Sequence, residues 1–283
     1  MLVGFFKDFA VAEEFVGNAT GASKLRALAD RVAASMNDHL WASSSAGADH
    51  YVTQWDGPAL NTTRDFVDYD SNLIAAAHGI PSPSRLSAIF GRIDGGRCRP
   101  SQTFVSEKWY GPGDTTHGNT GDSWTAMGRI AWFEALARQR GRDAHGFNSF
   151  LLTPLQQQLL NHTWMHERQF CDGTQQLNRT WAYFEYPAVV SMLLRHVKYG
   201  IQQGISSFTV DPLGPSSFEY RIGNIYVSYT PQAVSITAPG RDRTGLPPIN
   251  VTIGGLLPST VYDLQAQAAA LVSGMGGVLL PPL

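Results

Sequence analysis

Three segments of the sequence place carboxylates and aromatic side chains directly before an apolar run. They are residues 65–77, 118–127 and 181–190. Carboxylates can move protons and bind hydroxyl groups, and aromatic rings can stack on the apolar faces of sugar rings. If each apolar run is a helix, these side chains gather at helix N-termini and could line a cleft. The pattern therefore indicates carbohydrate chemistry.

The candidate catalytic carboxylates are Asp68 and Asp70 in the first segment and Glu185 in the third. Asp68 and Asp70 are two residues apart, so their like charges could keep one of the two carboxyls protonated. Glu185 lies between aromatic residues in the sequence, and apolar surroundings would also favour the protonated form of a carboxyl. Structural roles remain open as alternatives, because Asp70 could cap a helix and Glu185 could complement a helix dipole.

The candidate substrate-binding residues are the other carboxylates and aromatic rings of these loops. Asp122 could equally be a helix N-cap, Glu167 could pair with a neighbouring arginine, and the aromatic rings could belong to the core. The full set is Asp65, Tyr69, Trp109, Asp122, Trp124, Glu167, Trp181 and Tyr183.

The composition excludes several classes of function. The 283 residues are 43% hydrophobic, carry a net charge of −2, and have 21 scattered basic residues, so nothing indicates a nucleic-acid partner. Two cysteines without clustered histidines give no metal signature. We therefore expect neither a metal nor another cofactor, and the expected ligand is a carbohydrate.

Five Asn-X-Thr sequons indicate a glycoprotein of the secretory pathway, because chance would give roughly one. An accidental excess of threonine is the alternative. The sequons are headed by Asn18, Asn61, Asn161, Asn178 and Asn250. The apolar run at residues 1–6 is too short for a signal peptide, so we expect any leader to lie upstream. A secretory location would allow a disulfide between Cys98 and Cys171, with two free thiols as the alternative.

Hydrophobic periodicity predicts an alternation of helices and long loops in the first two thirds of the chain. Each loop leads into an apolar inner helix, so the three loops should emerge at one end of the fold, and loops of this length usually carry function. The predicted helices are 22–41, 71–78, 82–96, 122–140, 147–162 and 186–199, and the loops are 42–70, 97–121 and 163–184.

From about residue 206 the period changes from 3.6 to 2, which predicts strands. Gly223-Asn224 between two alternating runs is typical of a β-hairpin. We therefore expect a helical domain over 1–205, a small β-sandwich-like module over 206–264, and a flexible tail over 265–283. A membrane anchor in the uncharged tail is disfavoured by its glycines and prolines.

The boxes Asp-Phe-Val-Asp-Tyr-Asp-Ser-Asn-Leu (65–73), Gly-Asn-Thr-Gly-Asp-Ser-Trp (118–124) and Tyr-Phe-Glu-Tyr-Pro (183–187) resemble those of six-hairpin glycosidases. This superfamily includes trehalase, processing α-glucosidase and α-L-rhamnosidase-type enzymes. The resemblance implies a mainly α fold, with three helical hairpins forming half of an (α/α)6 toroid before the β module. The other half would lie upstream or in a second chain.

The resemblance also implies an inverting glycoside hydrolase with a general acid and a general base. Asp68 or Asp70 would be one member of the pair and Glu185 the other, with Glu185 favoured as the base. Two alternatives stay open: a non-catalytic carbohydrate-binding or assembly subunit, and, less favoured by the acidic loops, a toroid polysaccharide lyase. The pattern specifies neither the sugar nor the linkage.

Overall fold

The computed structural model describes thirteen stretches of the chain, which form two compact units, Met1–Leu193 and Leu194–Leu283. The described residues are 1–42, 50–52, 54–55, 63–64, 69–95, 106–107, 125–161, 168–170, 185–204, 207–214, 217–223, 225–237 and 250–254.

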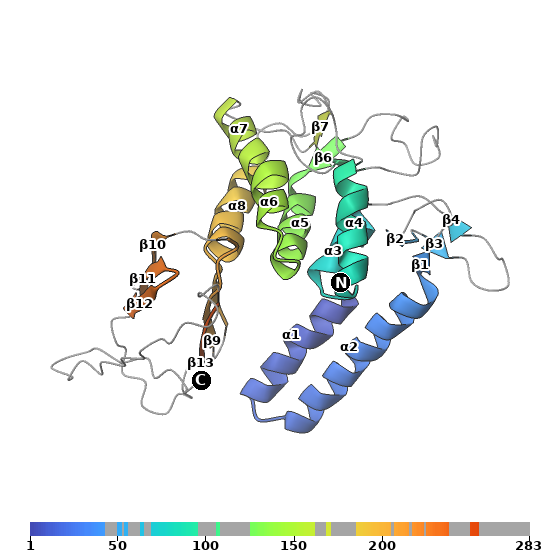
Figure 1. Ribbon diagram of the computed structural model, residues 1–283. Helices are drawn as coiled ribbons and strands as arrows, with labels where there is room; N and C mark the ends of the chain where they lie inside the picture. The colour runs from blue at the N-terminus through green and yellow to red at the C-terminus, as the bar shows by residue number, and fades with distance from the viewer. Residues whose placement is uncertain are drawn as a thin grey trace. The chain divides into compact units, whose positions relative to one another are not determined.

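The first unit begins with a helical hairpin of α1 (Leu2–Phe15) and α2 (Ala19–His39), which lie side by side in Figure 1. The turn is set by Gly17, with φ +83°, and by Asn18, whose Oδ1 accepts a hydrogen bond of 3.0 Å from the Gly21 N–H. An asparagine at this position caps the helix because it satisfies one of its free N–H groups. The helix predicted over 22–41 is confirmed, whereas α1 has no counterpart among the sequence predictions.

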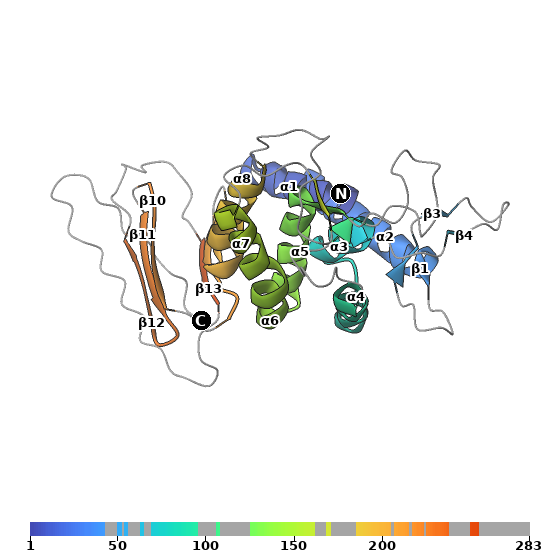
Figure 2. The same ribbon diagram turned by 90° about the horizontal axis from the view of Figure 1, so that it is seen from above.

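Three further helices build the centre of this unit: α3 (Tyr69–Ala77), α4 (Pro83–Gly95) and α5 (Gly128–Arg140). In Figures 1 and 2, α5 lies between α3 on one side and the α6–α7 segment on the other. Gly79, with φ +68°, follows α3 and allows the chain to turn toward α4. The predicted helices 71–78 and 82–96 are confirmed.

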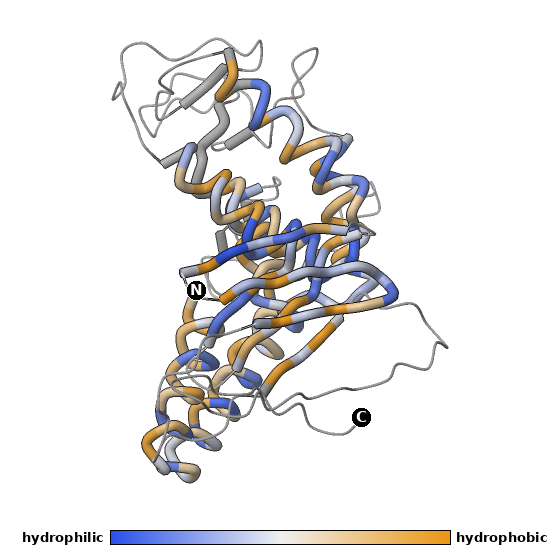
Figure 3. Tube along the Cα trace, turned by 90° about the vertical axis from the view of Figure 1, so that its left-hand side faces the viewer, coloured by the Kyte–Doolittle hydropathy of each residue, from blue (hydrophilic) through white to orange (hydrophobic). Residues whose placement is uncertain are grey.

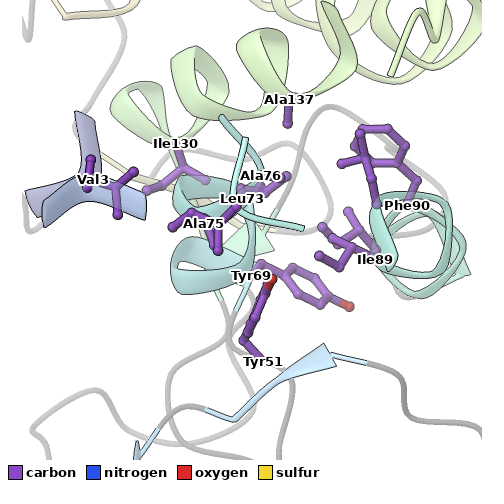
Figure 4. Close-up of a cluster of buried hydrophobic side chains, with 14 residues drawn as sticks. Val3, Tyr51, Tyr69, Leu73, Ala75, Ala76, Ile89, Phe90, Ile130 and Ala137 are labelled. Atoms are coloured by element: carbon purple, nitrogen blue, oxygen red, sulfur yellow. The ribbon is translucent and has the colours of Figure 1, made fainter. Parts of the chain in front are cut away.

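The core of the first unit lies where α3 meets α1, α2, α4 and α5 (Figure 4). Alanines on α3 and α5 allow the two backbones to approach, while larger side chains fill the remaining space. The cluster consists of Val3, Ala29, Tyr51, Tyr69, Leu73, Ala75, Ala76, Ile80, Leu86, Ile89, Phe90, Ile93, Ile130 and Ala137.

After α5 the chain forms a short helix α6 (Ala144–Gly146), a π-helical segment η1 (Phe147–Leu152) and α7 (Thr153–Asn161). The prediction of helix over 147–162 is confirmed, and the change from π to α geometry falls at Thr153. The predicted helix 186–199 is also present, as α8 (Glu185–Met192) followed by the π-helical segment η2 (Leu193–Lys198).

Short strands occur in all three segments that the sequence predicted as loops. In the first, β1 (Trp41–Ala42) pairs with β2 (His50–Tyr51), and β3 (Gln54–Trp55) pairs with β4 (Thr63–Arg64). The other two contain β5 (Ser106–Glu107) and β7 (Arg168–Phe170). These strands flank β6 (Thr125–Met127), which lies at the start of the predicted helix 122–140, in one antiparallel sheet of order β5–β6–β7. The helix predicted from residue 122 therefore begins only at Gly128, and Asp122, its candidate N-cap, lies outside the described residues.

The predicted toroid is wrong. In the described part of the first unit, the α1–α2 hairpin packs with a group formed by α3, α4, α5, α7 and α8, small sheets of two or three strands accompany them, and no toroid forms. The period of a helix indicates which of its faces is buried. It does not specify the angles between successive hairpins that would curve them into a ring.

Among its described residues, the second unit contains two three-stranded sheets. One has the order β10 (Phe218–Ile222), β11 (Ile225–Thr230), β12 (Ala233–Thr237), and Ile222 lies opposite Ile225 as the predicted hairpin requires. The other has the order β13 (Asn250–Ile253), β9 (Ser207–Val210), β8 (Ile201–Gln203), with β13 parallel to β9.

Both sheets contribute to a single hydrophobic cluster in this unit: Ile201, Phe208, Val210, Val227, Tyr229 and Val251. The predicted boundary at 205/206 falls inside the second unit, since the first unit ends at Leu193. The predicted tail 265–283 lies outside the described residues.

Candidate functional site

The β5–β6–β7 sheet joins the segments that precede α5 and α8. Thr125 lies opposite both Glu107 and Phe170, and Met127 lies opposite Arg168, directly before α5 begins at Gly128. β5 also packs against α3, the helix that follows the first acidic segment. Strands from the loops before α5 and α8 thus lie in one sheet, and β5 contacts the helix that follows the first acidic segment. Residues 118–124 and 181–184 of the other two acidic segments lie outside the described residues.

Asp70 lies in the first turn of α3, half-buried. Because α3 begins at Tyr69, Asp70 is not its N-cap as considered above, but its charge is well placed to interact with the positive end of the helix dipole. Tyr69 is only 4% exposed and belongs to the core cluster, so its ring packs inside the unit. Of the first acidic segment, Asp65 and Asp68 lie outside the described residues.

Next to Asp70, Asn72 fixes the strand β2 to the start of α3. The Asn72 Oδ1 accepts a hydrogen bond of 2.8 Å from the Tyr51 N–H, and its Nδ2 donates one of 3.1 Å to the Tyr51 carbonyl oxygen. Asn72 is completely buried, so both bonds are shielded from water. This side chain replaces a neighbouring strand on that edge of Tyr51.

The Tyr51 hydroxyl continues this network away from α3. It donates a 2.6 Å hydrogen bond to Asn37 Oδ1, which also accepts one of 2.7 Å from Arg85 Nη1, and Arg85 lies 4.7 Å above the ring of Trp41. Burial raises the pKa of Tyr51 to about 12, although the charge of Arg85 acts in the opposite direction. Tyr51 is therefore a hydrogen-bond donor at neutral pH, and the network supports the start of α3.

The remaining predicted site residues fall largely outside the described part. Glu185 is the first residue of α8, Asn161 the last residue of α7, and Asn250 the first residue of β13. Asn18 is exposed, and its Nδ2 donates a 2.6 Å hydrogen bond to Glu13. Outside the described residues lie Trp109, Asp122, Trp124, Glu167, Trp181, Tyr183, Cys98, Cys171, Asn61 and Asn178.

The sequence analysis missed a buried charged cluster around Arg138. The Arg138 guanidinium is fully buried and binds Glu134 at 2.8 Å, Asp94 at 2.6 Å, and Asp143. Burial alone would lower the pKa of Arg138, but the charges and hydrogen bonds of Glu134 and Asp94 raise it above its ordinary value. The spacing of Glu134 and Arg138, four residues apart on an apolar helix, was the signal that could have revealed the pair.

This cluster links α4, α5 and the start of α6, and Arg138 also lies 4.9 Å from the ring centre of Phe90. Because one buried guanidinium joins side chains from three parts of the chain, the cluster stabilises the fold.

A pocket of about 600 Å³ lies at the C-terminal ends of α3 and α5. The segment before α4 and residues of α4 itself also line it. Among its lining residues are Gly79, Pro83, Phe90 and Arg140. The length of α5 separates this pocket from the β5–β6–β7 sheet by about 20 Å. Of the predicted catalytic and substrate-binding residues, Tyr69 and Asp70 are those whose side chains the structure describes, and neither lines the pocket.

No protein-family model matches the chain, and no curated protein shows significant similarity to it. The resemblance to six-hairpin glycosidases therefore stays a prediction. Among the described residues, no helix has the length and apolar character needed to cross a membrane, and no group of three or more His, Cys, Asp or Glu side chains is arranged to hold a metal ion.

Proposed function

We propose that the protein is a glycoside hydrolase that cleaves a glycan or oligosaccharide with a pair of carboxylates. The observation that supports this proposal is the β5–β6–β7 sheet, which joins the segments before α5 and α8 and packs against α3. The three segments that carry carboxylates and aromatic rings are connected in sequence to these elements. A cleft built from them would combine stacking surfaces with acids and bases.

In the proposed mechanism, Asp68 or Asp70 is one catalytic carboxyl and Glu185 is the other. An inverting enzyme places a general acid against the glycosidic oxygen and a general base against a water on the opposite face of the sugar ring. The two carboxyl groups then lie about 6.5–9.5 Å apart, which leaves space for that water. Glu185 is the proposed base and the aspartate the proposed acid.

The proposed location is outside the cell or in the lumen of the secretory pathway. Asn18 supports it, because this sequon asparagine is exposed at the turn between α1 and α2. β7 ends at Phe170, next to Cys171, and β5 begins at Ser106, eight residues after Cys98. A disulfide between the two cysteines is part of this proposal, because an oxidising compartment would allow it.

The proposal is tested by assaying the full chain against a panel of aryl glycosides and natural oligosaccharides. We expect turnover with inversion of the anomeric centre, and a loss of about 100-fold or more in kcat for Glu185→Gln. Asp68→Asn and Asp70→Asn identify which aspartate is the acid. Glu14→Gln is the matched control, because Glu14 lies on α1 and pairs with Arg26.

Wild-type activity in Glu185→Gln would refute the role of Glu185. Sugar binding without turnover, unchanged in Glu185→Gln, would identify a carbohydrate-binding protein instead. An unsaturated uronate product would identify a lyase.

A further inference from the structure

The helix α1 exposes large apolar side chains along a face that points away from α2. Val3 and Ala10 are buried, whereas Leu2 is 62% exposed, Phe5 59% and Phe9 46%. The buried pair and the exposed side chains lie on different sides of one helix. Figure 3 shows α1, which begins at the N label, coloured mostly toward the hydrophobic end of the scale.

The exposed side chains follow a regular spacing. Leu2, Phe5, Phe9, Ala12 and Val16 are separated by three, four, three and four residues. This is the spacing of a seam along which two helices pack side by side. The rings of Phe5 and Phe9 already stack on each other, with centroids 5.8 Å apart, so the stripe is continuous.

The stripe is large compared with ordinary surface patches. Met1 and Phe15 lie beside it and are 76% and 49% exposed, and Val16 is 74% exposed. With side chains of this size, the apolar area is on the order of 700 Å². The largest patch on a typical monomer is about 300–600 Å², whereas each partner of a standard interface buries about 800 Å². The α1 surface thus has the area of one half of an interface.

The charges on α1 argue against a membrane as the partner. Helices that lie on anionic membranes carry lysines and arginines on their polar face. On α1 the polar residues are Lys7 and three acidic residues, Asp8, Glu13 and Glu14. The second half of the helix contains no basic residue, and its two acidic residues bind neighbours: Glu13 accepts a hydrogen bond from Asn18, and Glu14 pairs with Arg26.

We propose that the α1 surface, defined as Met1, Leu2, Phe5, Phe9, Phe15 and Val16, binds the same surface of a second copy of the chain. A two-fold pair uses one patch twice, so a self-complementary stripe of aromatic and aliphatic side chains is sufficient. Burial of the stripe from both copies removes about 1,400 Å² from water, within the range of specific interfaces. This inference does not depend on the proposed hydrolase activity.

The experiment is sedimentation velocity of the full chain at concentrations up to about 100 µM, above the dissociation constant of a modest interface. We expect a dimer for the wild type, and a dissociation constant raised about 100-fold or more by Phe5→Glu combined with Phe9→Glu. Leu160→Glu is the matched control, because Leu160 is 86% exposed on α7. This control should dimerise like the wild type.

A positive measurement complements the disruptive variants. A benzophenone amino acid at Phe9 keeps an aromatic ring in the stripe, and ultraviolet light should link it to residues 1–16 of a second copy. A wild-type monomer overturns the proposal. So does a dimer that persists in the folded double variant, a cross-link to any other segment, or a monomer that binds anionic vesicles through Phe5 and Phe9.

Discussion

At the scale of single residues, the structure assigns work to side chains that the sequence pattern did not single out. Asn72 is an example, because one buried amide satisfies both backbone groups of Tyr51. Asp70, two residues earlier, was predicted as a candidate catalytic residue from its residue type and its position before an apolar run. Residue type indicates which chemistry a side chain can perform. The pair of hydrogen bonds that Asn72 makes depends on the position of β2 in the folded protein, and the residues around Asn72 do not specify that position.

His78 gives a pH dependence of stability. Burial lowers the pKa of His78, the positive charges of the amino terminus, Arg140 and Lys7 act in the same direction, and Asp8 opposes them. The unfolded chain then binds more protons than the folded one below about pH 6.5. Stability is present above this pH and is lost as the pH falls through the window toward the lower folded-state pKa.

We expect His78→Gln to lose less unfolding free energy than the wild type between about pH 7.5 and pH 5.5. Urea unfolding across this range measures the difference. His145→Gln, at an exposed histidine on α6, is the control and should follow the wild type. Parallel pH profiles for His78→Gln and the wild type would exclude this role of His78.

At the scale of elements, the sequence predicted helices well where polar and apolar faces alternate and glycine or proline ends the run. α2, α3 and α4 are such cases. It missed α1, whose apolar residues surround most of its circumference and so weaken the 3.6-residue signal. It also extended α5 back over Thr125–Met127, because the pairing of β6 with β5 and β7 overrides local preference.

The α1–α2 hairpin provides a test of an element boundary. Asn18→Ala removes the oxygen that binds the Gly21 N–H and should lower the unfolding free energy by about 1 kcal/mol, whereas Asn18→Ser keeps a capping oxygen. Chemical unfolding of protein made without glycosylation measures this. Equal stability of the two variants would contradict a capping role.

The same site separates capping from glycosylation. Thr20→Ala destroys the sequon and leaves Asn18 in place. Expressed through a secretory pathway, this variant should lose the mass of one glycan if Asn18 is modified. An unchanged mass would show that the cap is the only role of Asn18 in that host.

At the scale of the whole molecule, the sequence predicted a helical part followed by strands, and both parts are present. The toroid failed because the arrangement of helices depends on packing angles, which a list of helices does not contain. For the candidate site, the sequence predicted that the three loops meet only as a consequence of the assumed ring. The structure shows strands from the loops before α5 and α8 in one three-stranded sheet, and the convergence of the acidic segments themselves stays a prediction.

Each unit has its own core, so each core should respond to its own substitution. Leu73→Ala in the first unit should cost about 2–5 kcal/mol, and Val227→Ala in the second about 2 kcal/mol. Scanning calorimetry should show two transitions, each lowered by one of the variants. A single transition that both variants lower equally would mean that the chain unfolds as one unit.

The parallel pairing of β13 with β9 has a consequence for how the protein is made. β9 is the middle strand of its sheet, yet one of its two neighbours follows it by about forty residues, which a ribosome adds in roughly 2–8 s. During that interval β8 can already cover one edge of β9, while the other edge offers its backbone groups to any neighbouring nascent chain. Synthesis of Val251 and Ile253 closes this edge, so the speed of translation between the two strands sets how long the growing chain is open to mispairing.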